Sequence, residues 1–599
     1  MSSDPADAAS TATEPGSDHR ARLYMLLFWC VVAVVLGAVL WVVVSGLVAR
    51  ARLNDVRGEI TQLRTAVSHG DLPRARRISQ HVADQTASAH ELTSGPAWWV
   101  GANLPLLGTP LRTARTITAQ ADVLTNQILP RLMQLSAVND HIRTADERLD
   151  LTPLISAQPK LVEAGRRASS ALRAIRASDP SWASPVSSAR RSTLHQLTKV
   201  VGDLSGVNRA VGILLPMLGQ HGSKRYFIGF LNEAESRGVG GVPGAFAIAS
   251  ADHGRVRFEH FGSDLDLMHV RARVNLGAEY KALYGQDDPA GTFANSDISP
   301  DFRNAARIWA GMWQAKTGQR VDGALAIDPI ALSYLLAVTG PAQVPGGVRV
   351  SAANVATLTQ AGQYRRFPGT SPAQVVARKA FLDSIAAAVS ERLLRAGSAP
   401  RLVTALSRSA RERRLLVYSA DPAIERNLLS AQWAGALGPA AGRTYTGYVV
   451  NNATGGKLDY YLRSSMTYRR TDCADGGVAT TTLTLTNTAP RTGLPPYVTI
   501  RSDGFAGARP GDNRELVTYY ASANATIERV MLEGQIVPFA VLPEGSTSTV
   551  TVDVELPAGS RRRLAVTVRE PATSRPVQVL RQPRANPQAL TRSGDHHCR

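Results

Sequence analysis

The character of the chain changes at the segment Tyr226-Phe-Ile-Gly-Phe-Leu-Asn-Glu-Ala-Glu-Ser-Arg-Gly-Val-Gly-Gly-Val-Pro-Gly244. Its first six residues are apolar or aromatic and predict a short β-strand. The polar, glycine-rich residues after them predict a loop, and Ala245-Phe-Ala-Ile-Ala249 predicts the next strand. Asp252-His-Gly254 is typical of a hairpin turn that leads into a third strand at 255–258. Strands therefore begin here, after a long helical region.

Helices alternate with strands downstream of this segment. We expect a helix over 302–317, a buried strand over 321–327 and a second helix over 329–338 that is closed by Gly340. A longer helix follows at 373–396. Alternating strands and helices indicate an α/β domain, which we assign to residues 221–436.

The regions on either side have a different periodicity. Residues 50–220 carry apolar side chains at helical spacing, interrupted near Gly95-Pro96, and predict an α-helical stalk or hairpin. Beyond the α/β domain, residues 437–575 alternate with a period of two and predict an antiparallel β-sandwich. Its predicted strands lie at 480–486, 497–500, 526–532 and 550–556. Residues 576–599, which are rich in Pro, Arg and Gln, predict a flexible basic tail.

Near the N-terminus, the segment 23–49 contains no Asp, Glu, Lys, Arg or His. As a helix it would be about 40 Å long, enough to cross a hydrocarbon core of about 30 Å. A cleaved signal peptide is the alternative, but its apolar core is much shorter. We therefore predict a single transmembrane helix. Residues 1–22 are predicted to be a disordered cytoplasmic tail, which leaves the bulk of the chain extracytoplasmic, although the flanking arginines do not decide the direction.

Composition restricts the function classes. The 599 residues are enough for several domains, and the formal net charge is +19 at pH 7. A basic surface attracts anionic lipids, wall polymers or nucleic acid, but no nucleic-acid-binding module accompanies the charge. We therefore expect no nucleic-acid partner. Of the three cysteines, Cys30 lies in the predicted span, while Cys473 and Cys598 are either a disulfide or two free thiols.

The predicted loop after the first strand is the first candidate site. Arg237 offers paired donors for a phosphate, and glycines allow a backbone to approach a ligand closely. In this interpretation Asn232, Glu235, Gly240 and Gly241 line the ligand. The alternative is a structural turn held by a network of Asn, Glu and Arg hydrogen bonds. Neither a dinucleotide-binding fingerprint nor a Walker A loop is present.

A second candidate site is Asn295-Ser-Asp297-Ile-Ser-Pro-Asp301. Asp297 and Asp301 have oxygen ligands suited to a divalent cation, but Asp301 also stands where it would cap the following helix. Asp328 likewise precedes a predicted helix and is better explained as a cap. The signatures of zinc hydrolases, serine hydrolases and dithiol redox proteins are absent.

These motifs resemble the domain of unknown function 4012 family. The resemblance is carried by Asn232-Glu-Ala-Glu-Ser-Arg-Gly-Val-Gly-Gly241, Asn295-x-Asp297-x-x-Pro-Asp301-Phe302 and Val321-Asp-Gly-Ala-Leu-Ala-Ile-Asp-Pro329. It extends in order from about residue 20 to 590, including Pro96, Trp98, Asn451-Asn452 and Lys457. The family implies a membrane-anchored exported protein of bacteria and assigns no activity.

The order of strand, Arg/Gly loop, Asp-capped helix and Asp-Gly strand also resembles, more distantly, the LytR-CpsA-Psr family. That family transfers glycopolymers from polyprenyl pyrophosphate carriers to peptidoglycan, using Arg, Asp and a magnesium ion. The resemblance implies that Arg237 and Arg378 contact pyrophosphate and that Asp264 or Asp301 holds magnesium. The family's Arg-Ser-Asp-Thr run and its dense R-x-R-x-x-D pattern are missing here.

Two functions remain open at this level. The first is a non-catalytic, single-pass envelope protein that serves as a scaffold or binds envelope glycopolymers or lipid-linked precursors. The second is a phosphotransferase-type glycopolymer ligase of the LytR-CpsA-Psr kind, with magnesium as its cofactor. The second function requires Arg237, Arg378 and an aspartate to converge on one apolar-walled pocket, whereas the first does not. The candidate aspartates are Asp264, Asp297 and Asp301.

Overall fold

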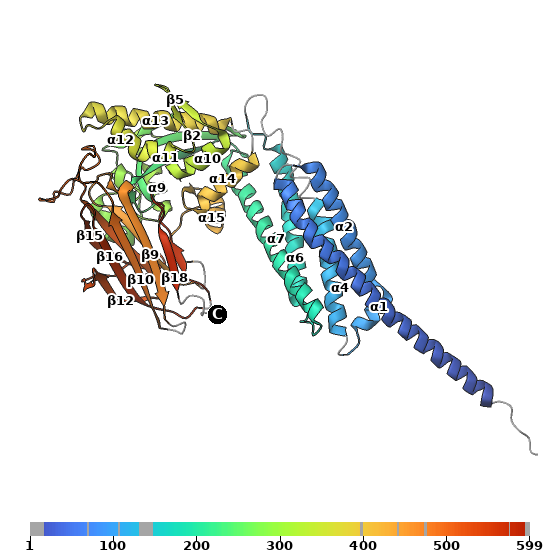
Figure 1. The fold of residues 1–599 in the computed structure, drawn as a ribbon. Helices are drawn as coiled ribbons and strands as arrows, with labels where there is room; N and C mark the ends of the chain where they lie inside the picture. Colours follow the sequence, from blue (N-terminus) through green and yellow to red (C-terminus); the bar gives the residue numbers. More distant parts are fainter. Residues whose placement is uncertain are drawn as a thin grey trace, which may run out of the picture. The chain divides into compact units, whose positions relative to one another are not determined.

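The computed structural model describes residues 17–68, 71–105, 108–130, 148–395, 399–439, 443–471, 476–573 and 575–593. The chain divides into two compact units (Figure 1). One is formed by residues 1–140 and 153–208, and the other by residues 141–152 and 209–599. We describe each unit by itself.

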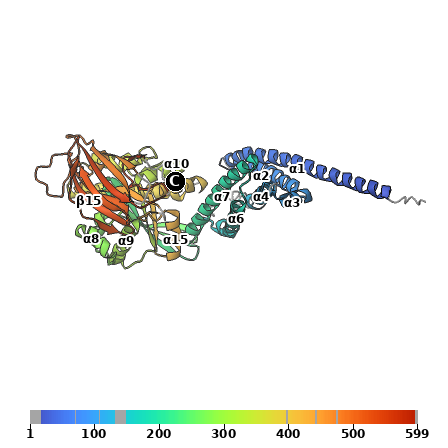
Figure 2. The same ribbon diagram turned by 90° about the horizontal axis from the view of Figure 1, so that it is seen from below.

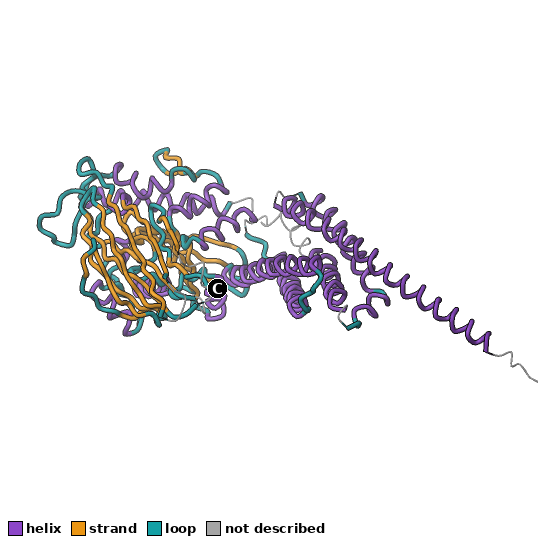
Figure 3. The backbone as a smooth tube through the Cα atoms, turned by 60° about the horizontal axis from the view of Figure 1, so that its bottom comes forward, coloured by secondary structure: helices purple, strands orange, loops and turns teal. Residues whose placement is uncertain are grey.

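The first unit is helical, as its periodicity predicts (Figure 3). Its helices are α1 (Ser17–Ser68), α2 (Leu72–Ser94), α3 (Pro96–Ala102), α4 (Gly108–Asp122) with the π-helical turn η1 (Val123–Ile128), α6 (Thr152–Ala177) and the start of α7 (Ser184–Met217). Small and branched side chains fill the core, as at Ile117, Leu172 and Leu197. The short α3 begins at Pro96, whose ring suits the first turn of a helix and interrupts the preceding one.

Helix α1 carries the apolar segment predicted to cross a membrane. Among the described residues it is the one helix long and apolar enough to do so. Its apolar side chains are exposed from Leu23 to Leu47, and this half of α1 extends beyond the other helices of its unit (Figure 1). Of the predicted tail at 1–22, residues 1–16 lie outside the described part, and residues 17–22 belong to α1 rather than to a disordered segment.

In the second unit, five strands form a mixed sheet in the order β3-β2-β1-β4-β7. The strands are β1 (Lys224–Arg237), β2 (Gly240–Asp252), β3 (Arg255–Ser263), β4 (Gly323–Ile327) and β7 (Leu415–Ser419). Strand β1 pairs in parallel with β4, and the other neighbours are antiparallel. The sheet and the helices between its strands occupy the region predicted to be α/β.

Helices cover both faces of this sheet. Side chains of β1 alternate in direction, so successive residues of the strand pack against helices on opposite faces. Phe227 packs with helix α9 (Phe302–Thr317), where it lies 5.4 Å from the ring of Trp309. Ile228 and Phe230 point to the opposite face. That face is covered by α10 (Pro329–Thr339), α13 (Pro372–Leu394), α14 (Ala399–Arg411) and α15 (Pro422–Ala431).

The predicted helix boundaries near the sheet are confirmed. Asp301 caps α9, and Gly318 ends it in the left-handed conformation. Asp328 caps α10, and Gly340 follows its last turn. The prediction of a loop after Leu231 is wrong, because β1 continues to Arg237 and returns as β2 from Gly240. Polar side chains suggested a loop, but burial against the rest of the unit keeps this hairpin extended.

The region predicted to be a β-sandwich forms two sheets with one shared core. The first sheet has the order β13-β12-β16-β10-β9-β18, and the second β14-β15-β11-β8-β17. The strands are β8 (Tyr445–Asn452), β9 (Leu462–Arg470), β10 (Gly477–Asn487), β11 (Asn513–Ser522), β12 (Thr526–Leu532), β13 (Gln535–Ile536), β14 (Leu542–Glu544), β15 (Thr547–Leu556) and β16 (Arg561–Glu570). Leu483 of β10 and Tyr519 of β11 meet in the core because alternate residues of each strand face inward. Residues 497–500, predicted as a strand, form a turn and an irregular segment instead.

The C-terminal segment is ordered where a flexible tail was predicted. Strand β17 (Gln578–Leu580) pairs in parallel with β8, and β18 (Ala589–Ser593) pairs in parallel with β9. Between them, Gln582 donates to the carbonyls of Val450 and Arg237 at 2.7 and 2.6 Å and accepts from the Val450 N–H at 2.9 Å. The predicted tail is therefore wrong for residues 578–593. Cys473 and Cys598, which were predicted to be either a disulfide or two free thiols, lie outside the described residues.

Replacement of Gln582 tests this role. We expect Gln582→Ala to lower the free energy of unfolding by about 2–3 kcal/mol, because it leaves buried main-chain groups of Val450 and Arg237 unpaired. Urea unfolding monitored by circular dichroism measures the effect. Gln535→Ala, at an exposed position of β13, is the matched control. Equal stability of the two variants would mean that the C-terminal segment does not hold the second unit together.

Candidate functional site

The candidate site is the tip of the β1–β2 hairpin, which is buried on all sides. Every residue from Leu231 to Ala249 is buried, including Glu233, Glu235 and Arg237. A run of this length with charged side chains requires partners, because an unpaired charge in the interior is very costly. Partners come from the end of β8 and the segment after it, from the 3-10 turn η6 (Leu458–Tyr461) and from the C-terminal segment. Others are Ala294 and Asn295, which accept from Arg237, and Gln360 and Arg414, which donate to Glu233.

Arg237 uses all of its donors within the protein. A guanidinium has five N–H groups. The acceptors are the carbonyls of Ala294 (3.0 Å), Ser236 (3.0 Å) and Asn452 (3.1 Å), Glu235 Oε1 (2.6 Å) and Asn295 Oδ1 (3.3 Å). The side chain is also only 6 % exposed. No N–H group remains to grip a phosphate, so the structural alternative for this segment describes Arg237 better.

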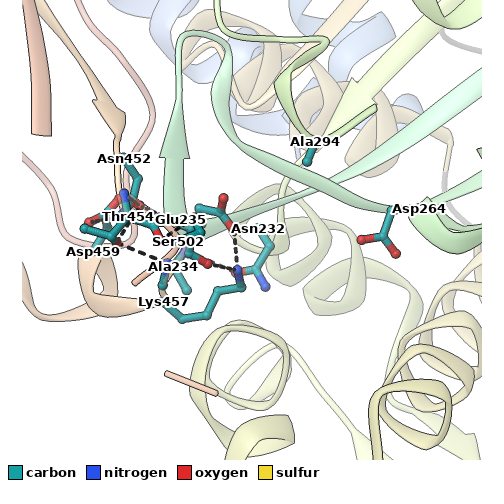
Figure 4. A network of polar contacts seen from close by, with 12 residues as sticks. Asn232, Ala234, Glu235, Asp264, Ala294, Asn452, Thr454, Lys457, Asp459 and Ser502 are labelled. Atoms are coloured by element: carbon teal, nitrogen blue, oxygen red, sulfur yellow. Dashed lines mark hydrogen bonds and ion pairs between the residues drawn. The ribbon is translucent and has the colours of Figure 1, made fainter. Parts of the chain in front are cut away.

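Glu235 lies between two cations, Arg237 and Lys457, of which Figure 4 labels Lys457. One carboxylate oxygen accepts from Arg237, and the other accepts from Lys457 Nζ. Burial by itself would raise the pKa of Glu235, but Lys457 and Arg237 outweigh it and hold the pKa below its ordinary value. Glu235 is therefore an ionised centre of an Arg237–Glu235–Lys457 triad, which joins the α/β part of the second unit to its β part.

Asp459 extends this network toward the β part. Its carboxylate accepts from the Ser236 N–H at 2.6 Å, from Asn452 Nδ2 at 3.0 Å and from Asn513 Nδ2 at 2.7 Å. Asn513 also donates to Glu515 at 2.6 Å. Burial, followed by the charge of Asp459, raises the pKa of Glu515 well above its ordinary value. Asn452 and Lys457 are among the residues that carry the family resemblance, whereas Asp459, Asn513 and Glu515 were not predicted from the sequence.

A second buried cluster lies beside the first. Arg414 donates to Glu233 at 3.2 Å and to Asp328 at 2.6 Å, and Gln360 donates to Glu233 at 2.6 Å. Burial, with the neighbouring Asp328, raises the pKa of Glu233 well above its ordinary value. Asp328 also caps α10 through the Ala331 N–H at 2.7 Å, as predicted. Glu233 stands within the Asn232-to-Gly241 motif but was not singled out as a site residue, and Arg414 belongs to no recognisable motif.

The other predicted ligand-binding residues have packing roles. Asn232 donates to the Tyr364 hydroxyl at 2.8 Å and accepts from the Ala234 N–H at 3.1 Å. A side chain at Gly241 would overlap the main chain of Asn232 on the facing strand. Gly240 has a φ of 153°, which disfavours other residues, and it packs near Pro583. These glycines permit close approach of backbone to backbone rather than to a ligand.

Arg378 is buried between aromatic rings. It is 1 % exposed, and its guanidinium carbon lies 3.5 Å from the centre of the Tyr497 ring. Nη1 donates to the Phe367 carbonyl at 2.7 Å, while Nη2 has no hydrogen-bond partner. Lys457 also lies over Tyr497, with Nζ 5.5 Å from the ring centre. Tyr497 thus connects Arg378 to the triad, but Arg378 is not presented to solvent.

The three predicted metal ligands do not form a metal site. Asp264 pairs with Lys379 at 2.8 Å, and Figure 4 shows it apart from the triad. Asp301 caps α9 and pairs with Arg303 at 2.5 Å. Asp297 is fully buried with neither carboxylate oxygen hydrogen-bonded, and burial raises its pKa well above the ordinary value. Among the described residues, no group of three or more His, Cys, Asp or Glu is placed to hold a metal ion. These donors do not fit magnesium, and no magnesium-dependent step follows from them.

An apolar cavity lies between the sheet and the helices α10 and α13. Its volume is about 40 Å³. The lining residues are Phe230, Leu231, Asn232, Gly244, Ala245, Ile327, Pro329, Leu332, Thr359, Leu382, Ile385 and Ala386. Arg237, Arg378 and the three predicted aspartates do not line it. The convergence on one apolar-walled pocket that a transferase would require is therefore absent from this cavity.

Together these contacts describe a multidomain protein. Its buried charged side chains form ion pairs and hydrogen bonds that hold parts of the second unit together. Residues 221–364 match the family described as protein of unknown function (DUF4012). No curated protein and no solved structure matches the chain. The resemblance to the LytR-CpsA-Psr family has no support from these comparisons.

A carboxyl group with a shifted pKa lies near Asp264. Asp383 of α13 is half-buried, and it faces Asp264 and Asp266 of the 3-10 turn η2 (Asp264–Leu267) as well as Lys379 on its own helix. Burial and the charge of Asp266 raise the pKa of Asp383 to about 6, against the opposing effect of Lys379. This carboxylate destabilises the folded state when it is ionised.

The tight approach at Gly241 predicts a steric effect. We expect Gly241→Ala to lower the free energy of unfolding by about 2–3 kcal/mol, because the new Cβ overlaps the main chain of Asn232. Gly244→Ala is the control on the same strand: a Cβ there meets nothing within 4 Å, and we expect a change within about 0.5 kcal/mol. Urea unfolding measures both. Tolerance of Gly241→Ala without loss of stability would contradict the assigned packing role.

The raised pKa of Asp383 predicts a pH-dependent gain in stability on its removal. Between about pH 4 and 6 the unfolded state releases the proton more readily than the folded state, so parent stability falls as pH rises. Asp383→Asn should therefore be more stable than the parent by about 1 kcal/mol at pH 7–8, allowing for solvent screening. The difference should vanish below about pH 4. Differential scanning calorimetry across this range measures it, and a pH-independent difference would argue against the shift.

Proposed function

We propose that the protein is a single-pass, membrane-anchored envelope protein with its bulk outside the cytoplasm. In this proposal it acts as a non-catalytic scaffold or binder of envelope glycopolymers or their lipid-linked precursors. The observation that carries the non-catalytic part is the complete use of the Arg237 donors by protein acceptors. A pyrophosphate-transfer site needs a cation that is free to stabilise charge as the leaving group departs.

The energetic balance supports the same conclusion. Withdrawing Arg237 to meet a substrate would leave Glu235, which is 4 % exposed, with only Lys457 to balance its charge in the interior. Breaking a buried ion pair costs about 3–5 kcal/mol. A substrate contact would have to offset this cost before it contributed to catalysis. Arg237 is therefore better suited to stabilising the second unit than to catalysing pyrophosphate transfer.

The anchor is supported by how α1 is used. The apolar segment continues without a break into the half of α1 that packs in the first unit. Trp98 donates through Nε1 to Ser45 at 2.9 Å. A signal peptide that was cleaved would remove this partner of a buried indole. The extracytoplasmic direction rests on the family resemblance, since arginines flank the span on both sides.

The size of the apolar cavity bears on the ligand. A cavity of about 150 Å³ accommodates benzene, whereas the cavity beside α13 measures about 40 Å³. In this conformation it has no room for a prenyl chain. The proposal therefore favours a scaffold or a binder of the glycan portion over a protein that stores the lipid chain within the α/β part.

The transferase alternative retains one supporting observation. Arg378 Nη2 has no hydrogen-bond partner. In addition, Arg378, Lys379 and Lys457 all lie near the Tyr497 ring. Its burial at 1 % exposure weighs against contact with a large pyrophosphate carrier. If the alternative holds, Arg378 rather than Arg237 is the group to test.

The decisive experiment uses the full chain reconstituted in lipid nanodiscs. We expect no magnesium-dependent binding of a polyprenyl pyrophosphate and no glycopolymer transfer to peptidoglycan. Arg237→Lys should lower the thermal unfolding midpoint by several degrees, since it removes most of the hydrogen bonds of a buried guanidinium. Magnesium-dependent binding that disappears in Arg378→Lys, with an unchanged unfolding midpoint, would support the transferase instead. Co-sedimentation with isolated wall glycopolymer separates a binder from a scaffold.

A further inference from the structure

Exposed apolar side chains gather on the short helix α3 of the first unit and in the turn that follows it. Trp99, Val100 and Leu104 are 59 %, 55 % and 47 % exposed. They belong to an uncharged run of residues between Glu91 and Arg112. Exposure of one apolar residue is ordinary, but several on one uncharged segment indicate a surface for an apolar partner.

The position of α3 along α1 is fixed by Trp98. This residue is 3 % exposed and donates to Ser45 at 2.9 Å. Its ring packs against Gly46, where a Cβ would lie 3.3 Å away. Figure 2 shows α3 beside α1 and α4. The exposed face of α3 is thereby held at the level of Ser45.

The rise of a helix per residue gives the depth of Ser45 in the bilayer. From Leu23 to Ser45 a helix rises about 33 Å, close to the thickness of about 30 Å of a hydrocarbon core. If the span begins near Leu23, Ser45 lies at the opposite boundary of the core. Helix α3 is then at the level of the lipid headgroups, where tryptophan side chains are favoured.

A second exposed tryptophan lies at the same end of the first unit. Trp182, in the turn between α6 and α7, is 68 % exposed. The turn is tied to the start of α4, because Thr113 donates to the Asp179 carbonyl at 3.0 Å. Arg112 connects α3 with the turn between α6 and α7. It donates to the Ala102 carbonyl of α3 at 2.6 Å, and its guanidinium lies 3.7 Å from the carboxylate of Asp179.

We propose that α3 and the α6–α7 turn form a second membrane contact, with Trp99 and Trp182 inserted in the headgroup layer of the bilayer that α1 crosses. The inference rests on the proposed anchor. The bilayer is the occupant because this surface is continuous with the apolar face of α1 through the Trp98–Ser45 contact. Two contacts beside the span restrict the tilt and rotation of the first unit relative to the bilayer plane.

The test places an environment-sensitive fluorophore on single cysteines in the full chain. Cys30, Cys473 and Cys598 are first replaced by serine. Probes at Trp99→Cys and Trp182→Cys report on the proposed contact, Val35→Cys reports on the span, and Val376→Cys on α13 is the aqueous control at 57 % exposure. The protein is reconstituted in vesicles of mixed anionic and zwitterionic phospholipid that carry a quencher either at the headgroup or at mid-chain.

We expect headgroup quenchers to reduce the emission at positions 99 and 182 by about twofold and mid-chain quenchers to act mainly at position 35. Emission at 99 and 182 that matches the control, with position 35 still quenched, would overturn the inference and leave the anchor standing. Blue-shifted emission at 99 and 182 without lipid quenching would assign the surface to a protein, including a second copy, and also overturn it. Absence of quenching at position 35 would remove the anchor itself.

Discussion

The second unit depends on one requirement, that charges in a protein interior be paired. Glu235 at the end of β1 is compensated by Arg237 on its own strand and by Lys457 from the β part. Removal of Glu235 would leave two buried cations without their counter-charge, and removal of either cation would take a donor from a buried carboxylate. The hairpin can extend into the interior because Asn452, Asp459 and the segment at 294–295 accept hydrogen bonds from its remaining donors. Arg584 belongs to the same system, and burial lowers its pKa to about 10. The buried ion pairs and hydrogen bonds between the β1–β2 hairpin and the β part favour one arrangement of the two parts.

Local signals in the sequence were sufficient for much of the fold. The α9 boundaries follow from Asp301 before the helix and Gly318 after it, which are effects of neighbouring residues on hydrogen bonds at helix ends. Strands β10 and β12 follow from a period of two. Strand β17 was missed because a parallel edge strand is held by main-chain hydrogen bonds, which composition does not encode. The β1 extension was missed because its polar side chains are satisfied by distant residues.

The candidate site was located in the sequence, but the local pattern left two roles open, a ligand-binding loop and a structural hydrogen-bond network. Arg237 and its glycine neighbours were identified because that residue combination is unusual after a strand. Whether a guanidinium binds a ligand or the protein depends on its acceptors, and one of these, the Asn452 carbonyl, lies 215 positions further along the chain. No local pattern contains that information. Asp264 and Asp301 show the same limit, since an ion pair with Lys379 and a helix cap account for carboxylates that also suit a metal.

The order in which the chain is made gives the C-terminal strands a further significance. Strands β17 and β18 each complete a different sheet, and Gln582 between them bonds to the β1–β2 hairpin. Residues of this segment therefore close contacts with a hairpin that lies 345 positions earlier in the chain. Until they arrive, β8 and β9 present open edges that can pair with other chains. The second unit is thus incomplete until β17 and β18 have been synthesised, and a chain that stops short of β17 lacks contacts in both sheets at once.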